Sequence, residues 1–292
     1  MGSYSPPPPP REEDAVYRGP EPQILPPGAG TVGPPGPVRR ERAWWASAPA
    51  TYVLVAINCG VFLWMLIHHV SYLSPTPDQL MAFGANNAGA VLNNNQWWRI
   101  VSAMFVHVGI IHLATNMWCL WNLGMLAEPL MGSGGVLAVY ILTGAAGNLL
   151  SVFVTRGWFY DPSDVVGGLF GPVGAGASGA VFGIAGALIV LLKSHWLPVP
   201  PGELRKLRRS VIYFAGINLV IGLATMIPGS FVRIDNMAHM GGCACGLLFA
   251  APMVPRVGAP MNLFLLRRRI AIGLVVLTLT LFAFFIASFQ GQ

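Results

Sequence analysis

The chain has 292 residues, of which 54% are hydrophobic and 10% are charged. A soluble domain carries about 25% charged residues, so this composition and the mean hydropathy of +0.60 indicate a protein that crosses a membrane several times. The net charge of +6 does not indicate nucleic-acid binding, because the basic residues separate hydrophobic segments and form no stripe with interleaved aromatic residues.

The first segment, residues 1–43, is polar and rich in proline, with a run of prolines at 6–10. It has too few apolar residues to form a core, so we expect a disordered cytoplasmic tail. It also lacks the apolar core and cleavage site of a signal peptide. Recruitment of partners through its prolines is an alternative to a merely solvated tail.

Seven hydrophobic segments follow and predict an all-α polytopic membrane protein, because crossing the hydrocarbon layer takes about 20 residues. They cover residues 51–70, 112–130, 134–155, 177–193, 210–228, 237–254 and 270–289. The stretch 71–111 is semi-apolar and contains no run long enough to be another span. Its tryptophans beside Arg99 indicate an interfacial structure at the level of the lipid headgroups.

The placement of lysine and arginine predicts the orientation in the membrane. If the N-terminus is cytoplasmic and seven spans follow, only Arg99, Arg156 and Arg233 of the 17 basic residues lie outside. The second, fourth and sixth segments then all run from outside to inside. Their first residues should therefore share one depth near the outer face.

The fourth segment is short and has a serine at its start. Residues 177–192 would form a helix of about 24 Å at about 1.5 Å per residue, whereas the hydrocarbon core is about 30 Å thick. Ser178 would therefore lie below the membrane surface, where irregular backbone is tolerated only if it lines protein or water. We expect the Gly/Pro-rich stretch 157–176 to line a wet cavity at Ser178.

His239 lies near the start of the sixth segment, at the predicted depth of Ser178, and a serine becomes a nucleophile when a base takes its proton. Small residues recur every four positions in both segments, at Gly179, Gly183 and Ala187 and at Ala238, Gly242 and Gly246. Such repeats let two helices approach closely. Packing without catalysis would give the same pattern.

His112 and Asn116 are one turn apart and fall on one face of the second segment. With the backbone N–H of Ser178 they could donate to the oxyanion that forms during amide hydrolysis, although a buried asparagine can also serve only to satisfy another helix. Asp235 precedes His239 by four residues and is expected to cap a helix. We therefore expect a Ser–His dyad with no third carboxylate.

Other polar and reactive residues have no predicted role in catalysis. Glu128 is the one acidic residue within the hydrophobic segments, and we expect it to bond to the start of the third segment. The four cysteines are Cys59, Cys119, Cys243 and Cys245. They lack the spacing of zinc or redox motifs and are expected to be small packing residues.

Together these residues resemble the rhomboid family of intramembrane serine proteases over about residues 51–254. The matching elements are Trp98-Arg99, His107, His112, Asn116, Gly176-Ala177-Ser178-Gly179 and Ala238-His239-Met240-Gly241-Gly242. Each element alone is weak, whereas the ordered set is specific.

The resemblance implies a six-helix catalytic core in which Ser178 is the nucleophile and His239 is the general base and acid. His112, Asn116 and the Ser178 amide would form the oxyanion hole. The glycines at 176, 179 and 242 would support this site. The implied substrates are single-span proteins, cut near the outer face at small residues in helices that unwind readily.

The resemblance also assigns roles around the site. Trp98 and Arg99 would belong to a membrane-embedded first loop, which His107 would help to hold in place. Segment 210–228 and loop 229–236 would act as gate and cap. The chain departs from the family pattern at the seventh segment, which is additional, and at Phe182, where tyrosine is common. Phenylalanine can still stack on the catalytic histidine.

These predictions divide the chain into a tail at 1–43, a catalytic membrane domain at 44–255 and a basic cytoplasmic loop with the seventh helix at 256–292. We expect no cofactor, metal or nucleic-acid partner. The lipid bilayer and transmembrane substrates are the expected partners. The expected location is a bacterial cytoplasmic membrane, with the site opening to the outer face.

Three other functions fit parts of the sequence. The main alternative is a non-catalytic rhomboid-like protein that binds and routes transmembrane clients, although such proteins typically lack the serine or the histidine. A transporter would favour ionisable residues along a path through the whole membrane. A metalloprotease would use His107, His112 and His239, but the sequence has no H-E-x-x-H motif.

Overall fold

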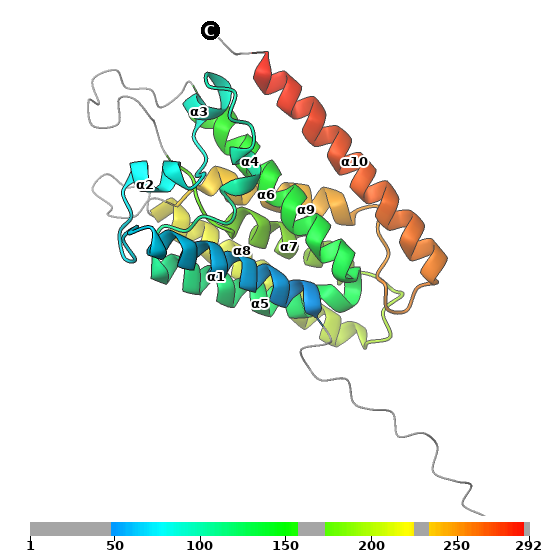
Figure 1. The fold of residues 1–292 in the computed structure, drawn as a ribbon. Coiled ribbons are helices and arrows are strands. Elements are labelled where there is room, and N and C mark those ends of the chain that lie inside the picture. Colours follow the sequence, from blue (N-terminus) through cyan, green and yellow to red (C-terminus); the bar gives the residue numbers. More distant parts are fainter. Residues whose placement is uncertain (1–47, 157–172, 225–233, 289–292) are drawn as a thin grey trace, which may run out of the picture. The chain divides into compact units, whose positions relative to one another are not determined.

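The computed structural model describes residues 48–156, 173–224 and 234–288. Within these ranges the chain is helical and forms no β-strand. The long helices are α1 (Pro49–Ile67), α5 (Ile110–Met131), α6 (Ser133–Thr155), α7 (Ser178–Leu191), α8 (Pro201–Ala224), α9 (Asn236–Ala250) and α10 (Met261–Ala287). In chain order the short helices α2 (Pro77–Ala82), α3 (Ala88–Leu92) and α4 (Arg99–Ser102) come between α1 and α5, and in Figure 1 they lie above both. The expected tail and most of the 157–176 and 229–236 loops lie outside the described residues.

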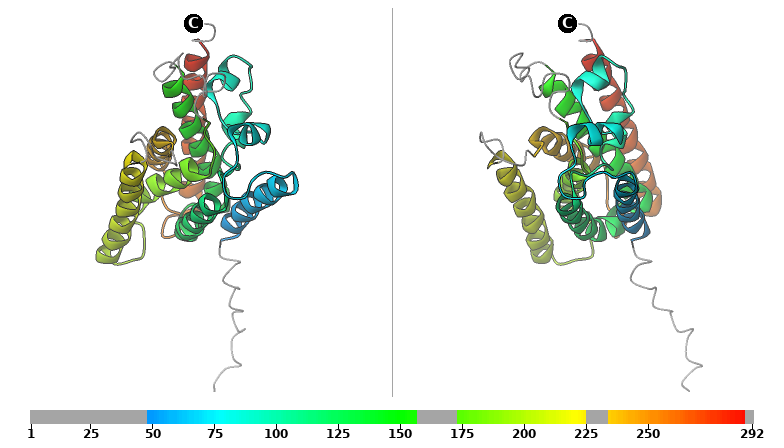
Figure 2. Two further views of the ribbon diagram at one scale, coloured as in Figure 1. Left: turned by 90° about the vertical axis from the view of Figure 1, so that its left-hand side faces the viewer. Right: turned by 60° about the vertical axis from the view of Figure 1, so that its left-hand side comes forward.

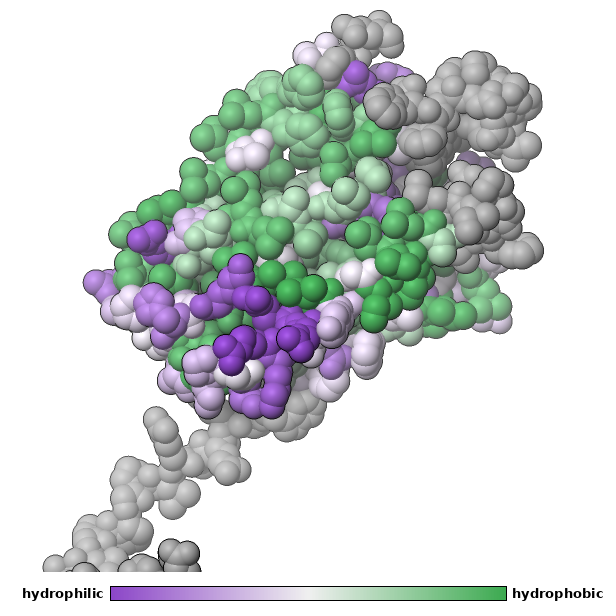
Figure 3. Space-filling model, turned by 180° about the vertical axis from the view of Figure 1, so that it is seen from behind, coloured by the Kyte–Doolittle hydropathy of each residue, from purple (hydrophilic) through white to green (hydrophobic). Residues whose placement is uncertain are grey.

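The described helices form an integral membrane protein. By length and composition, α1, α6, α8 and α10 are each able to cross a membrane, and α7 is a shorter apolar helix. Apolar side chains cover most of the described surface seen in Figure 3, and most hydrophilic side chains gather toward its lower end. This distribution suits a protein whose middle contacts lipid and whose ends contact headgroups and water.

Two helices begin earlier than their hydrophobic segments. Helix α8 starts at Pro201 and not near 210, and α10 starts at Met261 and not near 270. A proline suits the first helical position because its φ is already fixed there, and arginine and lysine favour helices. The basic residues at 205–209 and 267–269 therefore lie on helices, where a loop was expected.

Helix α7 lies at the centre of the bundle. It contacts α5, α6, α8 and α9, and its residues from 179 to 188 are all buried. Helix α8 lies along the edge of the bundle (Figure 2). Helix α10 packs on α6 and α9.

Glycines bring the backbones of α7 and α9 into contact. A Cβ built on Gly242 would lie 2.0 Å from the carbonyl oxygen of Gly179, and one on Gly246 would lie 2.0 Å from that of Gly183. No side chain fits at these distances, so the two helices can pack this closely only through glycine. The expected close packing of the small-residue faces is confirmed.

Glu128 joins the ends of three helices. Its carboxylate, only 2% exposed, accepts hydrogen bonds from the backbone N–H groups of Ala50 and Thr51 at 2.9 Å. It also accepts from the hydroxyl groups of Thr51 and Ser133, each at 2.7 Å. The expected bond to the start of α6 is confirmed, and the bonds to the start of α1 are additional.

Substituting Gly242 by alanine should destabilise the fold. The new methyl group would overlap the Gly179 carbonyl, and overpacking of this kind costs about 1–3 kcal/mol. Thermal unfolding of the purified protein measures the loss. The matched control is Gly273→Ala on α10, where a Cβ meets nothing within 4 Å. Equal unfolding temperatures for the two variants would contradict the contact.

Candidate functional site

Ser178 and His239 lie at the same end of the α7–α9 pair. Ser178 is the first residue of α7, and His239 lies in the first turn of α9. Gly179 and Gly242, which contact each other, lie one residue after Ser178 and three residues after His239. His239 is 5% exposed, so the imidazole is largely screened from solvent.

The ring of His239 stacks on Phe182. The ring centroids are 4.2 Å apart and the planes differ by 11°. Phe182 follows Ser178 by one turn and lies on the same face of α7, so the stack holds the imidazole beside the start of this helix. No hydrogen bond joins Ser178 to His239 in the described part of the chain, and Nδ1 of His239 has no partner there.

His112 lies against the segment that precedes α7. A Cβ on Gly176 would lie 2.6 Å from Cε1 of His112, and the φ of this glycine is +133°, so both space and backbone require glycine there. The N–H of Val108 donates to Nδ1 of His112 over 3.4 Å, which leaves the hydrogen of the neutral ring on Nε2. The amide of Asn116 donates to the His112 carbonyl at 2.9 Å and keeps a second N–H.

His107 joins the first loop to the residue before α7. Its buried ring has Nδ1 3.2 Å from the carbonyl oxygen of Phe105, and its Nε2 accepts from the N–H of Ala177 over 3.4 Å. A backbone pairing between Asn86 and Gly174, at 2.7 and 2.8 Å, links the same two segments. The N–H of Gly176 also donates to the carbonyl oxygen of Ala103 at 2.9 Å, so the first loop is attached to the start of α7 at three points.

The family model described as Rhomboid domain matches residues 94–256. The chain belongs to the rhomboid family. It is 32% identical over 211 residues to Rhomboid protease GluP of Bacillus subtilis (strain 168), which covers 72% of this chain and 36% of that protein. It is 31% identical over 208 residues to Rhomboid protease AarA of Providencia stuartii, covering 68% and 70% respectively.

A plant relative shows the same likeness. The chain is 32% identical over 189 residues to RHOMBOID-like protein 6, mitochondrial, of Arabidopsis thaliana, covering 64% of this chain and 54% of that protein. The chain thus spans about a third of GluP and about half of the plant protein.

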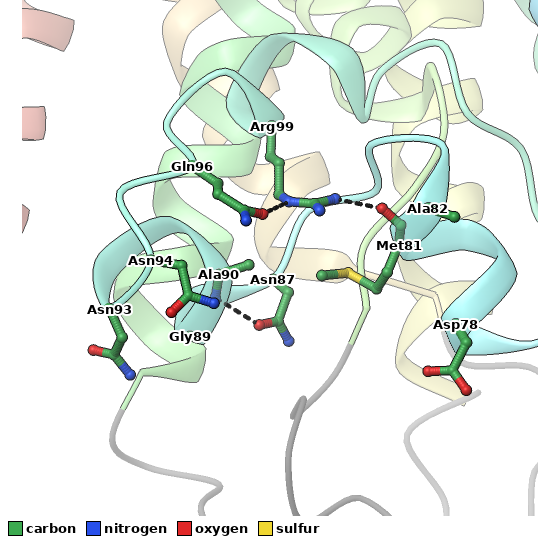
Figure 4. Close-up of a pocket in the computed structure, with 10 residues that line it drawn as sticks. All are labelled: Asp78, Met81, Ala82, Asn87, Gly89, Ala90, Asn93, Asn94, Gln96 and Arg99. Atoms are coloured by element: carbon green, nitrogen blue, oxygen red, sulfur yellow. Dashed lines mark hydrogen bonds between the residues drawn. The ribbon is translucent and has the colours of Figure 1, made fainter.

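In this rhomboid chain the Trp98-Arg99 pair organises the first loop. The guanidinium group of Arg99 donates to the carbonyl oxygens of Met81 at 2.7 Å and Ala85 at 3.0 Å, and to the side chain of Gln96. It lies 4.6 Å from the centroid of the Trp98 ring. Arg99, Met81 and Gln96 border a pocket of about 510 Å³ (Figure 4), and none of the candidate catalytic residues lines it.

Asp235 and Ser151 hold the start of α9. One oxygen of Asp235 accepts from the N–H of Ala238 at 2.9 Å, as expected for a helix cap. The other accepts from the Ser151 hydroxyl on α6 and lies 3.3 Å from the position of a Cβ on Gly174. Sequence reasoning missed Ser151, because no spacing signal pairs residues so far apart. Helix α6, helix α9 and the segment before Ser178 meet at this carboxylate.

A second pocket, of about 220 Å³, lies between α5 and α8. Its lining residues are Trp118, Cys119, Asn122, Leu123, Leu126, Leu207, Ser210, Val211 and Phe214. Helix α8 is the helix expected to act as a gate, and only 11% of its most apolar window is buried. The few buried residues of α8 are Leu204, Val211 and Gly222.

Other reactive groups are dispersed. All four cysteines are free thiols. Within the described ranges, no group of three or more His, Cys, Asp or Glu residues is arranged to hold a metal ion. The candidate site therefore consists of the serine, the histidines and the asparagine near the starts of α5, α7 and α9.

Asp235→Ala should weaken the start of α9. It removes the acceptor for the Ala238 N–H, and loss of a helix cap costs about 0.5–2 kcal/mol. Asp235→Asn keeps an acceptor and should cost less. The measurement is the unfolding temperature of these two variants and of Ser151→Ala, which removes only the bond between Asp235 and α6. A full loss in Asp235→Asn would show that the charge, and not the cap, matters.

Acid should destabilise the fold through His107. Burial and the neighbouring His112 lower the pKa of His107 to about 3, whereas an unfolded histidine has a pKa of about 6.5. As pH falls from 7 to 5, the unfolded state binds a proton that the folded state does not, which removes about 2 kcal/mol. His107→Gln should make the pH dependence of the unfolding temperature correspondingly shallower. Identical slopes would contradict this assignment.

Proposed function

We propose that this rhomboid chain is an intramembrane serine endopeptidase that hydrolyses peptide bonds in or near transmembrane segments, close to the outer face. The observation that carries the proposal is the glycine contact between α7 and α9, because Ser178 and the buried His239 both lie near the end of the helix pair at which this contact begins. The names of GluP and AarA as rhomboid proteases support the same reaction.

In the proposed mechanism Ser178 attacks the scissile carbonyl while His239 takes its proton. His239 then gives that proton to the leaving amine, and water hydrolyses the acyl-enzyme by the reverse transfer. Stacking on Phe182 fixes the plane of the imidazole. The hydrogen bond between the dyad residues need form only when substrate is bound, since such bonds are often long in the free enzyme.

The oxyanion would be bound by three donors. The hydrogen-bond pattern of His112 leaves its Nε2–H free to donate, and Asn116 keeps one side-chain N–H. The backbone N–H of Ser178 is in the first turn of α7, where N–H groups have no intrahelical acceptor. Loss of one such donor costs about 10²–10³ in kcat.

The proposal includes the full membrane arrangement. Seven spans, with α10 added to a six-helix core, a cytoplasmic N-terminus and a site opening outward, follow the bias of the basic residues. The residues between 44 and 255 would form the catalytic domain. Helix α8 would move away from α5 to admit a transmembrane substrate, which the pocket between them supports. A bacterial cytoplasmic membrane is the proposed location.

The test is cleavage of a reporter transmembrane substrate in liposomes. Ser178→Ala and His239→Ala should each abolish cleavage, and His112→Ala should lower it by about 10²–10³. Phe182→Tyr, which keeps the stack, is the matched control and should remain active. A serine-directed phosphonate should label the wild type but not Ser178→Ala. Cleavage or labelling that persists in Ser178→Ala would exclude the mechanism.

The alternative is a non-catalytic rhomboid-like protein that binds and routes transmembrane clients. The observation that favours this alternative is that no hydrogen bond joins Ser178 to His239 within the described residues. Under this alternative, the reporter would co-purify with the wild type and with Ser178→Ala equally, and neither would cleave it or react with the phosphonate.

A further inference from the structure

Arg256, in the link between α9 and α10, and Arg268, early in α10, meet at the turn between α5 and α6. Nη1 of Arg256 and Nη1 of Arg268 lie 3.8 and 3.7 Å from the point that a Cβ on Gly132 would occupy. Nη1 of Arg268 is also 3.5 Å from the corresponding point on Gly134. Both groups therefore border one small space, which remains open because neither glycine carries a side chain.

The backbone of Arg256 and the side chain of Arg268 each have a fixed contact. The N–H of Arg256 donates to the carbonyl oxygen of Leu130 at the end of α5, over 2.7 Å. The guanidinium group of Arg268 lies 5.2 Å from the ring centroid of Phe264, which is 1% exposed. The convergence thus follows from backbone and core contacts.

The two positive charges have no counter-charge in the described part of the chain. The ion pair found there joins Lys206 to Glu203 on α8, and neither Arg256 nor Arg268 has a further partner among the described residues. Glu128 precedes Gly132 by four residues, but it is buried and accepts bonds from the starts of α1 and α6. Two guanidinium groups held together in this way fit an anion that both can bind.

The position of the pair in the membrane selects the anion. Arg268 precedes an apolar stretch of α10 that runs from 270 to 287, so it lies at the level of the headgroups. One turn beyond Gly134 on α6, Leu137 is apolar and 39% exposed. A phospholipid can place its phosphate between the arginines and an acyl chain along this apolar surface. Free phosphate would contact only the arginines. Basic pockets between membrane helices bind anionic lipid headgroups in this way.

We propose that Arg256 and Arg268, above Gly132 and Gly134, form a binding site for the phosphate group of an anionic phospholipid. The site joins the end of α5, the start of α6 and the start of α10. Its occupation would fix the added seventh helix to the core. The proposal is independent of the catalytic role proposed for Ser178.

The test is a titration of the full-length protein in neutral phosphatidylcholine nanodiscs with phosphatidylglycerol, read as the unfolding temperature and as bound lipid by native mass spectrometry. Phosphatidylglycerol should raise the unfolding temperature of the wild type. Arg256→Gln/Arg268→Gln should need about tenfold more of this lipid, which corresponds to about 1.4 kcal/mol. The matched control, Arg267→Gln/Arg269→Gln, removes the same charge beside the site and should respond like the wild type.

A steric variant keeps the proposal testable if the double variant fails to fold. Gly134→Leu retains every charge, lies at an exposed position and fills the space beside Arg268, so it should also lose the response. An equal loss in both double variants would show diffuse attraction to anionic lipid and overturn the site. A rise in unfolding temperature with inorganic phosphate alone would identify a free-anion site and overturn the lipid assignment.

Discussion

The arrangement of the whole membrane domain depends on the backbone contact between α7 and α9. Gly242 and Gly246 meet the carbonyl oxygens of Gly179 and Gly183 at distances that exclude any side chain. Apolar lipid offers helices no hydrophobic reason to associate, so dense packing of this kind supplies the attraction. The same contact brings the starts of the two helices together, which is why a packing constraint also forms the candidate site.

Around this contact, the segment before α7 is held from several sides. The first loop reaches it through the pairing of Asn86 with Gly174 and through His107. Helices α6 and α9 reach it through the carboxylate of Asp235. The short length of α7 predicts that it begins inside the membrane, where the backbone before it needs partners. These bonds supply them, and they fix the direction in which α7 starts.

The opposite end of the bundle uses charge differently. Glu128 is buried and its oxygens accept bonds from the starts of α1 and α6, so its charge is satisfied within the protein. Arg256 and Arg268 converge at Gly132, and neither forms an ion pair among the described residues. One end of the domain thus carries the candidate site, and the other carries the buried Glu128 and the two arginines that we propose bind a lipid phosphate.

The sequence by itself determined the order of the helices, the short length of α7, the small-residue faces and the candidate residues Ser178 and His239. These follow from composition, local periodicity and charge bias, which are properties of neighbouring residues. Only the tertiary structure decided that Ser151 bonds to Asp235, that Glu128 reaches Thr51, and that two arginines converge at Gly132. The tertiary structure also showed that α8 and α10 start earlier than their hydrophobic segments, since a helix can extend past its apolar part. Contacts between residues distant in the chain are set by tertiary packing, and local sequence periodicity does not predict them.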